Sequence, residues 1–358
     1  RTLAFHPTLL VDLFLSQDAW VDALATLTGG GAGGAQVSAD MAEDLNRLLD
    51  GFEAQGSPAL GRAIAHERAR LGFGALSGLT MNQFWQQVNE RWTPEPCVAD
   101  EFGLCLGGGR YRVETDWATP AGGIEGSGRG RAAALSADSG YFRFFDPANV
   151  EILTKIVDGC GLNQRTWSYN AGLTNLEVDL TVFDTATGRG KSYRNPQATN
   201  FAAILDSDFL ECVPAPGAEN PLRTGASSPV PVSFLALGAG ACVPGPETLC
   251  LDGGRFRVEA EWETAAGATG AAHAAPLTDD TGTFWFFNAA NIELVVKTID
   301  ACGLAGFENY WVFAGGTTDV EVTLHVTDTE RDVSKTWRRP LGVPFAPILD
   351  SAAFATCP

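Results

Sequence analysis

The residues best suited to chemistry in this sequence are its eight cysteines, none of which lies in the first 96 residues. They form two sets of four with nearly the same spacing, 8, 55 and 52 residues and then 8, 52 and 55 residues. Zinc sites usually draw on closely spaced pairs such as C-x2-C, and the sequence has none. An even number of cysteines in two equivalent sets therefore predicts disulfides rather than a metal site, and hence an oxidising compartment.

The cysteine spacing leaves the pairing open, because four cysteines allow three pairings. We favour disulfides between neighbours within each set, which gives Cys97–Cys105, Cys160–Cys212, Cys242–Cys250 and Cys302–Cys357.

No catalytic motif in the sequence is complete. His66-Glu67 is followed by Arg70, so the His-Glu-x-x-His pattern of zinc proteases fails. Asp138-Ser139-Gly140 and Asp280-Thr281-Gly282 occupy equivalent places, but no histidine accompanies both, and turn formation explains the two triplets. We therefore predict a protein that is not an enzyme and has no catalytic residues.

Acidic residues in the same turns make calcium the best cofactor candidate, although we expect no cofactor. Calcium takes six to eight oxygen ligands, often from acidic loops, but the D-x-D-x-D-G spacing is missing and turn formation is the favoured interpretation. The candidate ligands are Asp138, Asp146, Asp279, Asp280 and Asn288.

Two Glu/Lys pairs recur in the sequence, each with its members four residues apart. They are Glu151 with Lys155 and Glu293 with Lys297. We interpret them as local ion pairs on the surface of a strand or helix.

Two dense aromatic runs, 141–145 and 283–287, are the strongest candidates for ligand binding. Alternate residues of a strand face opposite sides of a sheet, so the side chains on one side pack in the core. The other side would present Tyr141, Arg143 and Trp285, either covered by a loop or offered to a sugar or a protein surface.

The sequence around the cysteines is duplicated. Residues 105–114 match 250–259, Phe142 matches Phe284, Trp167 matches Trp311, and the offset stays between 142 and 145. A period this long means tandem domains. Alternating apolar and polar residues from Tyr111 to Trp117, followed by further short strand-like runs, predict a β-sandwich over 97–212 and another over 242–358.

Residues 1–93 show helical spacing of apolar residues, including Leu45, Leu48 and Phe52 behind an N-cap at Ser38. We therefore expect a multidomain fold of the α plus all-β class, with an N-terminal helical bundle before the two sandwiches.

A linker rich in Pro, Ala and Gly, 213–241, joins the repeats and contains an apolar strand-like segment. We expect this segment to pack on its own domains, or to pair with the sheet edge of another copy. Its apolar residues are Val230, Val232, Phe234, Leu235 and Leu237.

The formal net charge of −19 makes nucleic acid a poor partner. No apolar run is long enough to span a bilayer. With the cysteines, this favours a secreted chain whose signal peptide has been removed, although a chain that never had one is the alternative.

The second repeat resembles a β-rich repeat found in many exported bacterial proteins. The runs that carry this resemblance are Cys-Leu-x-x-Gly-Arg-Phe-x-Val, Thr-Gly-x-Phe-Trp-Phe-Phe, Asn-Ile-Glu-Leu-Val-Val-Lys, Trp-Val-Phe-Ala-Gly-Gly and Val-Thr-Asp-Thr, all within 250–329. The first repeat departs from it at 168–171. The resemblance implies export from a bacterial cell, a surface or accessory role and no catalytic residue.

Three functional hypotheses follow, in order of preference. The first is a non-enzymatic extracellular structural or adhesive protein, including a self-assembling filament or surface-layer subunit. The second is a module that binds carbohydrate or another surface ligand through exposed aromatics. The third is an enzyme with its activity in residues 1–93.

Overall fold

The structure is a computed structural model that describes residues 2–4, 62, 96–119, 126–187, 189–212 and 242–358. These residues are nearly all β: 55% lie in strands and 2% in helices, and none of their helices has seven or more residues. Within them, no helix is long and apolar enough to cross a membrane.

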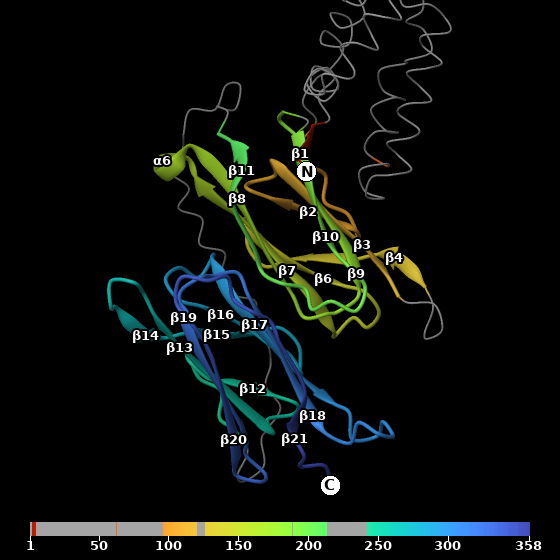
Figure 1. The fold of residues 1–358 in the computed structure, drawn as a ribbon, viewed down its shortest axis with the longest axis vertical. Coiled ribbons are helices and arrows are strands. Elements are labelled where there is room, and N and C mark those ends of the chain that lie inside the picture. The colour runs from red at the N-terminus through yellow and green to blue at the C-terminus, as the bar shows by residue number, and fades with distance from the viewer. Residues whose placement is uncertain (1, 5–61, 63–95, 120–125, 188, 213–241) are drawn as a thin grey trace, which may run out of the picture.

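The first repeat folds into two antiparallel sheets packed face to face (Figure 1). Its outer sheet has the order β1-β10-β9-β3-β2, with β4 beside β3, and these strands are Thr2–Ala4, Arg189–Asn195, Glu177–Asp184, Tyr111–Ala118, Gly103–Leu106 and Ser127–Arg129. Its inner sheet, in the order β11-β8-β7-β6-β5, consists of Ile204–Glu211, Arg165–Gly172, Val150–Gly159, Ser139–Arg143 and Arg131–Ala134. A single helical turn, α6 (Cys160–Asn163), joins β7 to β8.

The second repeat has the same arrangement (Figure 1). Its outer sheet has the order β12-β13-β19-β20, with β14 beside β13, and these strands are Leu249–Leu251, Phe256–Glu263, Glu321–Asp328, Val333–Arg339 and Thr269–Ala271. Its inner sheet, in the order β15-β16-β17-β18-β21, consists of His273–Pro276, Thr281–Trp285, Ile292–Asp300, Tyr310–Gly316 and Ile348–Phe354. The sheets form β-sandwich-like domains, which confirms the sandwich architecture predicted for this part of the chain.

Each sandwich has its own core, built by the alternation seen in the sequence. In β3 the inward residues Tyr111 and Val113 are buried, and in β13 Phe256 and Val258 are buried at the matching places. Because successive side chains of a strand point to opposite faces, the residues between them face outward.

The predicted fold class is wrong in its helical part, because the described residues contain no N-terminal helical bundle. Thr2–Ala4, which the bundle was expected to include, is strand β1 and pairs antiparallel with the start of β10. An open sheet edge offers unpaired backbone groups, and a short segment can satisfy them as a strand whatever its local propensity. Most of 1–93 and all of 213–241, with the apolar segment 230–237, lie outside the described residues.

All eight cysteines form disulfides, in the pairing that the sequence analysis favoured: Cys97–Cys105, Cys160–Cys212, Cys242–Cys250 and Cys302–Cys357. The short disulfides link the residue that opens each repeat to its first strand. The long ones join Cys160 or Cys302, which lie just after the central inner strand β7 or β17, to Cys212 or Cys357, which lie within three residues of the end of the last strand of the repeat.

Loop length predicts how much each disulfide stabilises its repeat. Replacing Cys302 and Cys357 together by serine should lower the free energy of unfolding by about 4 kcal/mol, because the open chain regains the entropy of a 55-residue loop. Replacing Cys242 and Cys250, which close an 8-residue loop, should lower it by about 2.5 kcal/mol. Urea denaturation of both variants measures the difference, and a larger loss for the short loop would contradict the prediction.

Candidate functional site: the interface between the two repeats

The inner sheets of the two repeats pack on each other through an apolar layer that is separate from both sandwich cores (Figure 1). Five residues of β7, β17 and the segment after β8 form it, and none is more than 5% exposed: Val150, Leu153, Leu173, Ile292 and Val295. Partly buried residues of both repeats surround it: Leu135, Tyr141, Leu277, Trp285 and Phe313. The described residues therefore form a stack of four sheets with three apolar layers.

Backbone also meets backbone in this interface. A Cβ added to Gly315 in β18 would lie 3.1 Å from the carbonyl oxygen of Gly172 in β8 and 3.3 Å from a Leu173 methyl group. A side chain at position 315 would push the two inner sheets apart, so this glycine permits the close approach.

Two lysines lie buried beside the apolar layer, and each bonds to the opposite repeat. Lys155, 3% exposed, donates from Nζ to Oδ1 of Asn291 at 2.7 Å and lies 4.0 Å from Glu293 Oε1. Lys297, 1% exposed, donates to Asn149 Oδ1 and, at 3.0 Å, to the carbonyl oxygen of Val150. Its Nζ lies 3.7 Å from Glu151 Oε2.

These contacts are reciprocal. Lys155 and Lys297 occupy matching places in the two repeats, and each reaches the Asn-x-Glu run of the other repeat. The interface therefore has the character of a two-fold one, in which equivalent surfaces contact each other, although both belong to one chain.

The remaining polar atoms of this cluster are also bonded. Each asparagine donates from Nδ2 to the glutamate of its own repeat, Asn149 to Glu151 and Asn291 to Glu293. Glu293 also accepts from the backbone N–H of Phe286 at 2.7 Å. Such a network is stable in a dry interior only because its members satisfy one another.

Aromatic rings complete the surroundings of the lysines. The Nζ of Lys155 lies 5.6 Å from the ring centroid of Tyr169, and that of Lys297 lies 5.6 Å from the ring centroid of Phe313. Both distances are within the range of a cation–π attraction. The ring faces therefore help to replace the water that each ammonium group loses.

Burial dominates the protonation of the cluster. It raises the pKa of Glu293 to about 7 and lowers the pKa of Lys155 to about 8, while the attraction between the two groups opposes both shifts. Burial likewise raises the pKa of Glu151 and lowers the pKa of Lys297. The attraction therefore compensates only part of the loss of hydration, as expected for buried ion pairs.

The structure differs from the expectation that these Glu and Lys residues form local surface pairs. Four residues along a strand span about 13 Å, so Glu151 and Lys155 of β7 are too far apart to bond to each other. The sequence does contain a relevant pattern, because charged residues recur at matching places in two otherwise apolar strands. Such retention indicates a buried partner outside the strand.

Two of the three candidate ligand-binding residues lie at this same interface. Tyr141 and Trp285 both border the apolar layer between the repeats. The guanidinium group of Arg143 lies 5.9 Å from the Tyr141 ring centroid and donates to the carbonyl oxygen of Pro147, while Trp285 stacks on His273 with 3.9 Å between ring centroids. These three side chains therefore contact other residues of the same chain.

Within each repeat, the candidate calcium ligands lie at the two ends of one strand. Asp138 and Asp146 stand at opposite ends of β6, a five-residue strand about 16 Å long, whereas calcium ligands lie about 2.4 Å from one ion. Asp279 and Asp280 are separated from Asn288 by β16 in the same way. Asp146, Asp279 and Asn288 accept backbone N–H groups, and Asp280 accepts the hydroxyls of Thr278 and Thr281.

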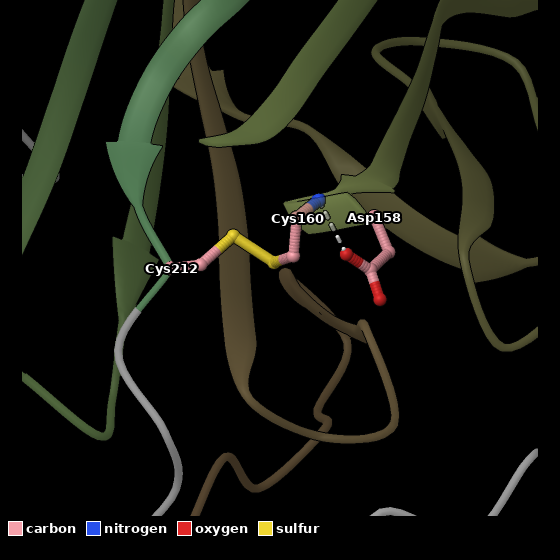
Figure 2. A group of neighbouring side chains, drawn as sticks. All are labelled: Asp158, Cys160 and Cys212. Atoms are coloured by element: carbon pink, nitrogen blue, oxygen red, sulfur yellow. Dashed lines mark hydrogen bonds between the residues drawn. A yellow bond between two sulfur atoms is a disulfide. The ribbon is translucent and has the colours of Figure 1, made fainter. Parts of the chain in front are cut away.

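Among the described residues, one group has the spacing of metal ligands: Asp158, Cys160 and Cys212 (Figure 2). Its two sulfur atoms are bonded to each other, and Asp158 accepts the backbone N–H of Cys160 at 2.9 Å. A disulfide offers no thiolate to a metal, so the group is the cross-link of a turn.

A feature that the sequence analysis did not single out is a pair of aromatic corners, Trp117 with Phe145 and Trp262 with Phe287. The ring centroids lie 4.6 Å apart in the first corner and 4.7 Å apart in the second. The two phenylalanines are 50% and 55% exposed. In the first corner, Trp117 also borders a cavity of about 230 Å³, together with Asp116, Arg129 and Asp179.

Comparison with protein-family models, with curated proteins and with solved structures finds no match to this chain. Its function must therefore be inferred from its own residues.

The raised pKa of Glu293 predicts a specific pH dependence. A raised folded-state pKa gives stability that is fully present below about pH 4.5 and lost as the pH rises to about 7. The wild-type protein should therefore lose stability relative to Glu293→Gln over this range, because the amide does not ionise. Urea denaturation at pH 5 and pH 7 measures the change, with the exposed Glu261→Gln as control. A relative gain for the wild type would show that attraction to Lys155 outweighs burial.

Proposed function

We propose that this protein is a non-enzymatic extracellular structural or adhesive protein whose two repeats act as one rigid unit. The buried reciprocal interface carries this proposal. Lys155, Lys297, Glu151 and Glu293 are groups that catalysis could use, but they lie buried and bonded between the repeats.

Rigidity is the property that the interface contributes. Domains joined by a linker usually move relative to each other unless their interface is large and apolar. Here an apolar layer with buried side chains is combined with directional bonds from both lysines. A protein that transmits force or presents a surface at a fixed distance needs this kind of fixed geometry.

The disulfides support an extracellular compartment, because disulfides persist in oxidising surroundings. Together with the resemblance to exported bacterial repeats, they support secretion or display on the surface of a bacterial cell. The partners that fit this role are further copies of the chain or a surface glycan.

Self-assembly is the version of this function that is easiest to test. Purified protein should form filaments or sheets in negative-stain electron micrographs, and its light scattering should rise with concentration, because docking onto another copy is a bimolecular step. Glu261→Gln, on the exposed outer sheet, is a control for non-specific aggregation. A protein that stays monomeric at high concentration would exclude the assembling version.

A second candidate function is ligand binding at the two aromatic corners. Exposed aromatic rings in matching places of both repeats are favourable surfaces for sugars or proteins.

Replacing Phe145 and Phe287 by alanine should reduce retention on a glycan array at least tenfold if the corners bind sugar. Phe307→Ala removes a ring of similar exposure, 53%, that has no counterpart in the first repeat, and should leave retention unchanged. Equal retention by both variants, or no retention of the wild type, would exclude sugar binding at the corners.

A further inference from the structure

We propose that the face between the repeats also joins separate molecules, so that repeat 1 of one copy docks on repeat 2 of a second copy. This exchange of repeats between copies rests on the proposed structural function, because the exchanged contact is the one by which copies would assemble. The partner is a second copy of this chain, and the docking surface is the inner sheet of each repeat.

The contacts that join the repeats lie in the repeats themselves. The apolar layer and both lysine networks use residues between Leu135 and Leu173 on one side and between Leu277 and Phe313 on the other. Every one of these contacts would be reproduced if the two faces came from different copies.

The connection between the repeats is long enough to permit this. Residues 213–241 place 29 residues between Cys212 and Cys242, and a fully extended chain of that length spans about 100 Å. The covalent link therefore raises the local concentration of the partner face but does not dictate which copy supplies it. Domain exchange of this kind is a common route from monomer to assembly.

The two faces match in their lysine networks but differ at one turn. Ser136 and Ser139 of repeat 1 both donate to the carbonyl oxygen of Ala290 in repeat 2, at 3.0 and 3.2 Å. The matching hydroxyls of Thr278 and Thr281 donate to Asp280 within repeat 2 instead. This contact therefore distinguishes the face of repeat 1 from that of repeat 2.

The proposed pairing of repeat 1 with repeat 2 determines the form of the assembly. Each chain has one face of each kind, so two copies can close reciprocally into a dimer, or many can join head to tail into an open chain. At low concentration the tethered pairing within one molecule should prevail, and exchange should increase with concentration.

A charge exchange between two full-length variants tests the proposal. Lys155→Glu places a carboxylate against Glu293, and Glu293→Lys places an ammonium group against Lys155, so neither variant can form the wild-type face within one molecule. Mixed in equal amounts, they can form two matched faces by exchange. We expect each variant alone to sediment as a monomer and the mixture to yield a species of twice the mass of one chain.

Control variants test whether the dimer depends on this face. The double variant K155E/E293K restores a matched pair within one chain and should sediment as a monomer, and thiol titration should show the disulfides of every variant intact. The reciprocal pair, Lys297→Glu mixed with Glu151→Lys, gives a second test if one variant of the first pair fails to fold. Arg338→Glu mixed with Glu321→Arg alters an ion pair of the outer sheet and should give no dimer.

A mixture that sediments like its separate components would overturn the exchange, as would a single variant that dimerises alone. Filaments of the wild-type protein without exchange between the variants would remove only this inference. Exchange without any wild-type assembly would remove only the assembling version of the proposed function.

Discussion

The burial of two lysines in the interface between the repeats is the constraint on which the arrangement of this molecule depends. An ammonium group taken out of water needs oxygen atoms at fixed positions, and for Lys155 and Lys297 those atoms belong to the opposite repeat. Each sandwich therefore completes the interior of the other. The orientation of the inner sheets follows from this requirement, because neither lysine finds its bonded oxygens in its own repeat.

Apolar packing and buried charge have different roles in this interface. The layer around Leu153 and Val295 supplies attraction that depends little on orientation, since burial of apolar area is non-directional. The lysine contacts add direction, because a shift of one residue along β7 would turn Lys155 to the opposite face of the sheet. Burial raises the pKa of Glu293 and lowers that of Lys155, and both shifts favour the neutral form of the group. The charges therefore contribute more to a unique alignment than to stability.

The sequence was sufficient for features that depend on local pattern. Alternation in 111–117 predicts a strand, and β3 covers Tyr111–Ala118. Cysteine spacing predicts disulfides but leaves their pairing open, and all eight cysteines form disulfides. It was insufficient where a distant partner decides. Thr2–Ala4 is a strand because β10 offers an edge, and Glu151 is buried because Lys297 reaches it from the other repeat. The residues next to Thr2–Ala4 and to Glu151 in the sequence do not reveal these distant partners.

Because the chain contains two copies of one domain, the residues kept in both copies can be sorted by whether the fold itself requires them. An Arg–Asp pair with a buried aspartate recurs, Arg110 with Asp184 and Arg255 with Asp328, and it ties matching strands together in both repeats. The disulfides, the core residues and the lysine networks also have structural reasons to persist. Phe145 and Phe287 differ, because half of each ring faces solvent and packing alone would not require phenylalanine at both places. Retention of these exposed rings in both copies is the observation on which the ligand-binding candidate rests.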